Sequence, residues 1–193
     1  MERVVLGTWP TPVQPMPRLA AALGLGPADL WLKRDDLTGL GGGGNKVRKL
    51  EFTLGAALAR GATTVVTTGA PQSNHARLTA AAAAARGLRA VLVLAGDPPS
   101  SAAGNLLLDA VLGAEVVWAG SADLAGRAAQ EAAARENAEV IPFGGSSTVG
   151  AEGYRLAGEE LSAQVPDLDT VVVAVGSGGT MAGLVRALGA DRV

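Results

Sequence analysis

The sequence predicts an α/β fold in which a parallel sheet is covered by helices on both faces. Strand-like segments alternate with helix-like segments along the 193 residues, an order that is typical of α/β folds. The strand-like segments are continuous apolar runs rather than alternating patterns, as expected for strands buried on both faces. No internal repeat and no long linker divides the chain. Because such sheets bind ligands at the carboxyl ends of their strands, the loops after the strands are where a site is expected.

The first expected elements follow a proline-rich opening. The segment LWLKRDD, at 30–36, is expected to form a short strand. From Asn45 onward, apolar residues recur at three- and four-residue steps, a spacing that predicts a helix. Asn45 is a good N-cap for this helix and Gly61 is a good stop.

Beyond this helix, the alternation continues to the end of the chain. The apolar segments predict strands at 63–69, 89–96, 114–120, 138–145 and 170–176. The segments between and after them predict helices at 74–86, 101–113, 122–136, 151–163 and 180–188. Two of the strands, 63–69 and 170–176, lead directly into loops of unusual composition.

Composition and charge exclude several classes of function. The net charge is −2 and there is no basic run, so neither nucleic acid nor a membrane is an expected partner. The absence of cysteine excludes disulfides, thiolate metal sites and a cysteine nucleophile. His75 is the one histidine, so no metal site of clustered imidazoles is expected, and a Ser-His-Asp triad would need His75 at its centre.

The apolar runs of the sequence bear on its location. The stretch before Pro10 is too short for the apolar core of a signal peptide. No run reaches the roughly 18 apolar residues that a membrane span needs. We therefore expect a cytoplasmic protein.

The first unusual loop is the four-glycine run of the segment GGGGNKVRKLEF, at 41–52. It does not match the phosphate-binding P-loop, Gly-x-x-x-x-Gly-Lys-Ser/Thr. Asn45 intervenes before Lys46, and Val47 stands where the magnesium-binding hydroxyl should be. What remains is a lysine in the first turn of a helix, where the helix dipole disfavours a positive charge. Lys46 is either an ordinary exposed lysine or a residue that binds an anion or takes part in chemistry.

The second loop, TTGAPQSNHAR at 67–77, places four consecutive polar side chains between a buried strand and an apolar helix. They are Gln72, Ser73, Asn74 and His75. Helix capping by Ser73 or Asn74 would account for only one of them. The N–H groups of this helix start, together with the Ser73 hydroxyl, suit a carboxylate or a phosphate.

The third loop lies in VVVAVGSGGTMAGL, at 171–184, where a strand leads into Gly176, Ser177, Gly178, Gly179 and Thr180. Glycines allow a backbone to wrap closely around an anion with its N–H groups pointing inward. The dinucleotide fingerprint Gly-x-Gly-x-x-Gly is not matched, because position 181 is methionine. A tight packing turn and a nucleotide-binding domain that uses this loop alone are the alternatives. The hydroxyl-rich composition favours a phosphate.

Together, the three loops outline a site with a phosphate cradle, a lysine and a second anion pocket. A cofactor with one phosphate and a lysine that can form an imine indicate pyridoxal phosphate. The second anion pocket then suits the carboxylate of an amino-acid substrate.

The sequence resembles a known family at this point. Its segments occur in the order seen in the D-cysteine desulfhydrase and 1-aminocyclopropane-1-carboxylate deaminase family: PTPVQPMPRL, LWLKRDDLTGLGGGGNKVRKLE, TTGAPQSNHARLTAAAAAARGL, GNLLLDAVLGAEVV, IPFGGSSTVGAEGY and GSGGTMAGL. Members are pyridoxal-phosphate enzymes of the tryptophan-synthase-β-like fold. The resemblance covers essentially all of the chain, and GGNKxRKLE together with QSNHxR is highly specific.

The resemblance implies roles for the lysines and the last loop. Lys46 would form the imine with pyridoxal phosphate, and Lys49 and the loop 176–180 would hold the cofactor phosphate. Lys49 follows Lys46 by one helical turn on the same face, so this assignment is geometrically sensible. We expect the helix dipole and the second lysine to lower the pKa of Lys46, which favours the neutral amine that imine exchange needs.

The resemblance also implies roles for the polar turn. Asn74 would hydrogen-bond the ring hydroxyl of the cofactor. Ser73 would bind the substrate carboxylate and join proton transfer. Gln72 and His75 would complete the substrate site beside them.

Two reactions are implied by the family. D-cysteine would undergo β-elimination to pyruvate, ammonia and hydrogen sulfide, and the cyclopropane acid would open to 2-oxobutanoate and ammonia. QSNHAR and KRDDLT favour the desulfhydrase. A pyridoxal-phosphate carrier without catalysis is the alternative of a different class.

The chain is shorter than members of this family. We expect residues 1–50 and 165–193 to form part of a large cofactor-binding domain whose C-terminal part is absent, and 51–164 to form a small α/β domain. The missing part would supply tyrosines near the substrate and the group that faces the pyridine nitrogen. A broad apolar face is then expected to be exposed, and a complete protein would form a homodimer.

Overall fold

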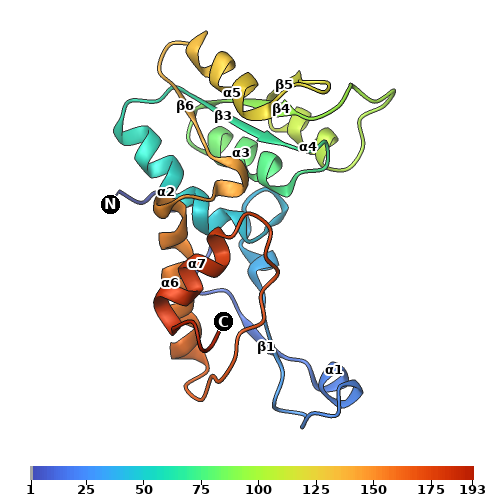
Figure 1. Ribbon diagram of the computed structural model, residues 1–193, viewed down its shortest axis with the longest axis vertical. Helices are drawn as coiled ribbons and strands as arrows, with labels where there is room; N and C mark the ends of the chain where they lie inside the picture. Colours follow the sequence, from blue (N-terminus) through green and yellow to red (C-terminus); the bar gives the residue numbers. More distant parts are fainter. Residues whose placement is uncertain (1) are drawn as a thin grey trace.

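The computed structural model describes residues 2–193 and shows strands alternating with helices (Figure 1). The α-helices are α1 (Pro17–Ala22), α2 (Lys46–Ala59), α3 (Asn74–Ala85), α4 (Asn105–Val111), α5 (Leu124–Ala133), α6 (Thr148–Gln164) and α7 (Gly179–Leu188). The strands are β1 (Val13–Pro15), β2 (Trp31–Lys33), β3 (Thr64–Gly69), β4 (Arg89–Leu94), β5 (Glu115–Trp118) and β6 (Ala138–Val140). Three short 3₁₀ turns are η1 (Asp35–Leu37), η2 (Leu40–Gly42) and η3 (Phe143–Gly145).

Four of the strands form a parallel sheet in the order β5-β4-β3-β6. Its central strand β3 is buried along its whole length, as its continuous apolar and β-branched sequence predicts. On β4, Leu92 and Leu94 pack into the cluster formed with α2, α3 and α4, whereas Val91 and Val93 pack against α5. Helices therefore cover both faces of the sheet, and the predicted α/β fold is confirmed.

A second, two-stranded sheet pairs β1 with β2 in antiparallel register, Gln14 opposite Leu32. The sequence predicts a strand at 30–36 but no partner for it in the proline-rich opening. The observed strand is shorter because the chain turns into η1 at Asp35. Pro15 is tolerated in β1 because this strand has a free edge where no N–H is needed.

The predicted strand at 170–176 does not form. No other segment of residues 2–193 pairs with this one as a strand. The Val171 N–H binds the Arg192 carbonyl at 2.7 Å. The side chain of Val172 is 95% exposed and that of Val175 is 60% exposed. Apolar, β-branched composition thus favours an extended backbone, but a strand also requires a neighbour that supplies hydrogen bonds.

Helix α4 and strand β6 are also shorter than predicted. Helix α4 begins only at Asn105, because Gly104 before it has a positive φ of 58°. Strand β6 ends at Val140, and Pro142 cannot donate a ladder hydrogen bond. The chain then turns through η3, whose Gly144 has φ 63°.

Helix α6 connects the sheet to the opposite end of the molecule, where α7 and the β1–β2 pair lie (Figure 1). It approaches its neighbours through glycines. A Cβ on Gly153 would come within 2.1 Å of the Arg48 carbonyl of α2, and one on Gly158 within 2.6 Å of the Ala187 side chain of α7. The predicted domain boundary at 50/51 falls within the continuous helix α2, and the division into two domains stays a prediction.

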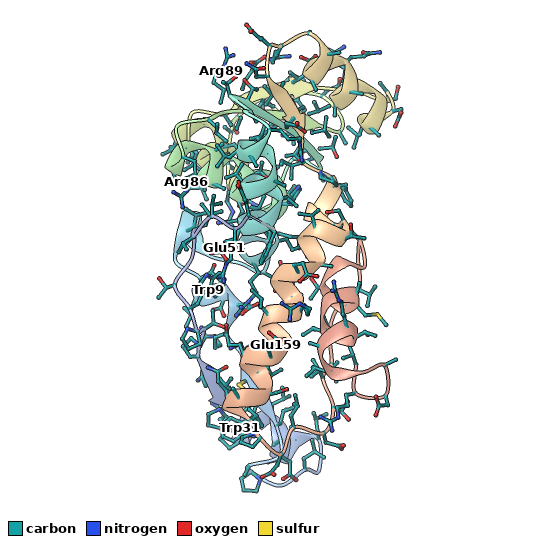
Figure 2. The ribbon with its side chains drawn as sticks, turned by 90° about the vertical axis from the view of Figure 1, so that its left-hand side faces the viewer. Trp9, Trp31, Glu51, Arg86, Arg89 and Glu159 are labelled. Carbon is teal, nitrogen blue, oxygen red and sulfur yellow. The ribbon has the colours of Figure 1, made fainter. Side chains whose placement is uncertain are left out.

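The N-terminal segment is tied to α2 by one buried carboxylate. Glu51 accepts hydrogen bonds from the side chain of Arg3, the N–H groups of Leu6 and Gly7, and the indole N–H of Trp9 at 2.7 Å. Figure 2 shows Trp9 beside Glu51. These donors replace the water that a buried carboxylate loses.

A second buried polar cluster joins α2 to α6. The Arg48 guanidinium donates to Asp35 at 2.9 Å and to Glu160 at 2.9 and 3.0 Å, and it stacks 4.1 Å from the ring centre of Trp9. Tyr154 donates to the same Asp35 at 2.6 Å. This cluster fixes the face of α2 that lies opposite the sheet, and thereby the orientation of the helix that carries both candidate lysines.

Candidate functional site

Lys46 lies at the start of α2, half-buried, and its Nζ donates to the Asn45 side chain at 2.9 Å. Asn45 occupies the N-cap position that the sequence predicts, but its backbone is helical and its side chain caps no N–H. Burial lowers the pKa of Lys46 below its usual value. The direction of this pKa shift agrees with the expectation from the sequence. The expected causes were the helix dipole and the second lysine, whereas the cause in the structure is the loss of water around the amine.

Lys49 lies one helical turn further and is almost completely buried. Its Nζ donates to the Gly144 carbonyl at 3.3 Å and to the Ser146 hydroxyl at 3.4 Å. Burial, and next the positive charge of Lys46, lower the pKa of Lys49 to about 8. Within residues 2–193, the polar partners of both ammonium groups are neutral oxygens, so the pair can neutralise an anion.

The loop at 176–180 meets Lys49 through Ser146. The N–H of Gly179, in the first turn of α7, donates to the Ser146 Oγ at 3.2 Å. The hydroxyls of Ser146 and Ser177 lie 2.6 Å apart. Gly178, the N-cap of α7, has φ 80°, a conformation that glycine adopts at little cost. Hydroxyls, an N–H group and an ammonium group therefore converge at the N-terminus of a helix, which is an arrangement that binds anions.

A cavity of about 60 Å³ opens between the two lysines and this loop. Its lining comprises Asn45, Lys46, Lys49, Ala174, Val175, Gly176, Ser177, Gly178, Thr180 and Met181. At ~10–15 Å³ for each water-sized group, the cavity has room for about four to six of them, which suits the five heavy atoms of a phosphate group. A Cβ on Gly179 would come within 2.5 Å of the Ser146 Oγ and 3.1 Å of the Lys49 Nζ. The residues present thus fit a phosphate-bearing ligand.

The four-glycine run packs against α3. Its carbonyl groups bind a cation: Arg77 of α3 donates to the carbonyls of Gly41 and Gly43, the latter at 3.0 Å. All four glycines, Gly41 to Gly44, have positive φ values. A Cβ on Gly42 would come within 2.7 Å of the Arg77 Nη1, and one on Gly43 would overlap the Asp36 carbonyl at 1.8 Å. The glycines are needed because the loop packs tightly around Arg77 and Asp36.

The polar turn at 72–75 is held mainly by its own neighbours. Ser73 caps α3, accepting from the Ala76 N–H at 3.1 Å. Gln72 accepts from the backbone N–H of Asn105 at 2.9 Å, and the Asn74 side chain accepts from that of Asn105 at 3.0 Å. The lining of the 60 Å³ cavity includes none of these residues. The structure thus joins Lys46, Lys49 and the loop 176–180, while the turn at 72–75 lies outside that cavity.

His75 is buried beneath the lysines rather than exposed to a ligand. Its Nε2 lies 2.9 Å from the hydroxyl of Thr67, which also donates to the Ile141 carbonyl at 2.9 Å. Since the Thr67 hydrogen points to that carbonyl, Nε2 carries the imidazole hydrogen. Burial, followed by the charges of Lys46 and Lys49, lowers the pKa of His75 to about 3. The ring is therefore neutral at ordinary pH.

The sequence patterns did not single out two residues of this arrangement, Ser146 and Arg77. Ser146 lies in a segment that was quoted only for its resemblance to a family, whereas Arg77 ends the segment 67–77, where only the polar residues 72–75 drew attention. Ser146 follows two glycines after a predicted parallel strand, so the same rule that selected the other loops would have found it. Arg77 gave no signal, because only the fold brings it to the glycine run.

Two properties of the molecule concern its environment and metal content. Among residues 2–193, no helix has the length and apolar character needed to cross a lipid bilayer. The same part of the chain contains no cluster of three or more side chains suited to a metal ion.

Comparisons with known proteins show the family of this chain. Residues 4–192 match the family model described as pyridoxal-phosphate dependent enzyme. A protein of Pyrococcus abyssi, named provisionally as a 1-aminocyclopropane-1-carboxylate deaminase, is 49% identical over 94% of this chain and 57% of its own length. A D-cysteine desulfhydrase of Salmonella choleraesuis is 42% identical over 91% of this chain and 56% of its own length. The chain thus spans somewhat more than half the length of these relatives.

Solved structures give the same result for the fold. The crystal structure of a homologue of 1-aminocyclopropane-1-carboxylate deaminase superimposes with a TM-score of 0.89 and 45% identity, covering 97% of this chain and 58% of that one. Maize serine racemase superimposes with a TM-score of 0.75 at 24% identity, covering 92% of this chain and 51% of that one. The second likeness shows a shared fold.

Proposed function

The chain belongs to the family of pyridoxal-phosphate dependent enzymes, and we propose that it supplies the cofactor-binding lysines of an enzyme that deaminates a small amino acid. The observation that carries the proposal is the pair of lysines on one face of α2, both with lowered pKa, beside the cradle of Ser146, Ser177 and Gly179. Two amines without carboxylate partners are costly in a fold unless a ligand uses them.

Lys46 is the residue that we propose to bind the cofactor covalently. It is half-buried and lines the cavity, and burial increases the fraction of its amine that is neutral. A neutral amine is the form that can attack a carbonyl. Asn45 holds the amine at the cavity wall by a 2.9 Å hydrogen bond.

Lys49 and the loop 176–180 are the groups that we propose to hold the phosphate. Lys49 would supply a positive charge, while the N–H of Gly179 and the hydroxyls of Ser177 and Thr180 would supply hydrogen bonds. A phosphate in the cavity would also raise the pKa of Lys49 from about 8, because an opposite charge favours the protonated amine. When bound, pyridoxal phosphate supplies an electron sink for the carbanion that forms at the substrate.

The turn at 72–75 is the group that we propose to meet the substrate. Ser73 and Asn74 stand at the N-terminus of α3, which suits the carboxylate of an amino acid. Asn105 of α4 fixes this turn by donating hydrogen bonds to the side chain and to the backbone carbonyl of Gln72. His75, neutral and buried, would orient the turn and would exchange no proton at neutral pH.

Two substrates are supported by the relatives. The turnover of D-cysteine with water to pyruvate, ammonia and hydrogen sulfide is supported by the desulfhydrase relatives and by the motif QSNHAR. Hydrolytic ring opening of 1-aminocyclopropane-1-carboxylate to 2-oxobutanoate and ammonia is supported equally by the deaminase relatives. We propose the D-cysteine reaction first and the cyclopropane reaction as its alternative.

The experiment has two stages. Pyridoxal phosphate is titrated into the purified chain and into Lys46→Ala, and binding is followed by cofactor absorbance; we expect a new band that only the wild type shows. Pyruvate from D-cysteine and 2-oxobutanoate from the cyclopropane acid are then measured. A band without either product would support a cofactor carrier, and the absence of a band would exclude both interpretations.

We also propose that the complete enzyme is a cytoplasmic homodimer, as the family resemblance implies. Light scattering of the cofactor-loaded protein would measure its mass directly. A monomeric mass at micromolar concentration would contradict the dimer.

A further inference from the structure

Arg77 occupies an unusual position for a buried cation. Its guanidinium donates to the carbonyls of Gly41 and Gly43, and its Nη2 also reaches the Asn74 side chain at 3.4 Å. The side chain is largely buried. One planar group therefore contacts both the loop that precedes Lys46 and the polar turn that carries Asn74.

The glycine run is shaped by this contact. Gly42 has φ 84°, and a Cβ there would come within 2.7 Å of the Arg77 Nη1. Gly44 has φ 138°, and a Cβ there would lie 3.0 Å from the Leu78 side chain of α3. The loop thus lies directly on α3, and its last residue is two positions before Lys46.

The contact needs an arginine. A guanidinium presents several N–H groups in one plane and can bind two carbonyls at once, whereas an ammonium group is a point charge without this fork. Asp109 of α4 lies close enough for the charge of Arg77 to act on its carboxyl group, yet the Asp109 oxygens and the Arg77 Nε have no hydrogen-bond partner among the described residues. The hydrogen bonds that Arg77 makes go to the loop and to Asn74.

We propose that Arg77 is a positioning residue of this site, which fixes the Gly41–Gly44 loop, and with it Lys46, relative to Asn74. Its importance for catalysis rests on the proposed function, but the positioning itself is a property of the chain without cofactor. The four glycines and Arg77 form one structural unit, in which the glycines permit the close approach and the arginine supplies the bonds.

The test perturbs this contact from both sides. Arg77→Ala removes the donor, Arg77→Lys keeps the charge without the fork, and Gly42→Ala pushes the loop away while Arg77 is retained. The matched control is Gly61→Ala, since Gly61 has a similar φ of 80° with nothing within 4 Å of the added Cβ. It imposes the same backbone strain without a clash.

Two measurements on the cofactor-free chain report the position of Lys46. The first is amide hydrogen exchange in residues 39–46. The second is the pH midpoint for acetylation of Lys46, with Lys33 as internal reference; the chain has only three lysines, Lys33, Lys46 and Lys49. A displaced loop exposes the amine, which moves the midpoint upward towards the ordinary lysine value.

The expected results distinguish positioning from simple core packing. Arg77→Ala and Gly42→Ala should speed exchange in 39–46 by about tenfold or more and raise the Lys46 midpoint, Arg77→Lys should be intermediate, and Gly61→Ala should match the wild type. The proposal is overturned if Arg77→Ala lowers Tm but leaves both readouts unchanged. If Arg77→Ala does not fold, the same result for Gly42→Ala overturns it. Failure of the wild type to attach the cofactor would refute the proposed function alone.

Discussion

The cost of burying Lys49 yields a quantitative prediction for the cofactor-free chain. Lys49→Met removes the charge and keeps an unbranched apolar stem in the same space. Because the folded protein lowers the pKa of Lys49, the charged amine is less stable in the fold than in the unfolded chain. We therefore expect Lys49→Met to raise the free energy of unfolding at neutral pH.

The magnitude follows from the size of the pKa change. A fall from 10.5 to about 8 corresponds to an upper limit of about 3.5 kcal/mol, at ~1.4 kcal/mol for each pKa unit. The hydrogen bonds from Lys49 to Gly144 and Ser146 are long, 3.3 and 3.4 Å, so they offset little of the free-energy cost of burying the charge. Allowing for the methylene contacts that methionine does not reproduce, we expect a net gain of roughly 1–2 kcal/mol.

Urea unfolding between pH 6 and pH 10.5 tests this prediction. The penalty is fully present below pH 8, so the gain of Lys49→Met should be largest there. It should disappear as the pH approaches 10.5, where the unfolded lysine also loses its proton. Inorganic phosphate should stabilise the wild type and leave the variant unaffected. A variant that is less stable than the wild type at pH 7, with the same phosphate response, would refute the account of this site.

Three further predictions concern other buried groups. Burial raises the pKa of Asp109 to about 6, and the charge of Arg77 offsets this in part. The ionised carboxylate therefore destabilises the fold above pH 6. In urea unfolding, Asp109→Asn should raise the free energy of unfolding by about 1–3 kcal/mol at pH 8 and leave it unchanged at pH 4. Burial alone would raise the pKa of Glu160, but hydrogen bonds and charges from Arg48 and Lys33 outweigh it and lower this pKa to about 2. Glu160→Gln leaves Arg48 with Asp35 as its remaining charged partner and should lower Tm, with a loss of about 3 kcal/mol in urea; an unchanged Tm would contradict the role of this cluster. Gly179→Ala places a methyl group 2.5 Å from the Ser146 Oγ and should abolish cofactor binding in an absorbance titration. The control Gly61→Ala, outside the cavity lining and with nothing within 4 Å of the added Cβ, should bind the cofactor normally.

The parallel sheet and its helices could be predicted from the sequence because strands that are buried on both faces consist mainly of apolar and β-branched residues. Strand β3 consists of valine and threonine up to Gly69, β4 is apolar after Arg89, and each is followed by a segment with helical periodicity. The segment 170–176 has the same composition but forms no strand, because pairing depends on a neighbour that composition does not reveal. Strand β1 is the opposite case. It lies in the proline-rich opening and was not predicted, but it forms a strand because it pairs with β2.

The site could be predicted in part for a similar reason. Lys46 and Lys49 are adjacent by helical geometry alone, and the loop 176–180 follows the rule for ligand loops in α/β folds. The partner of the glycine run could not be predicted, because Arg77 is more than thirty residues away and reaches the loop only when α3 packs on it. Glycine-rich sequence indicates a close approach, but the fold decides whether the group approached is an anion or a cation.

Peptide mapping after borohydride reduction tests the central claim most directly. The purified chain is incubated with pyridoxal phosphate, reduced, digested and analysed by mass spectrometry. We predict that the cofactor mass is found on the peptide that contains Lys46, with Lys33 and Lys49 unmodified. Attachment to Lys33 or Lys49 instead, or no attachment under conditions where the chain is folded, would contradict the assignment of Lys46 as the cofactor-binding residue.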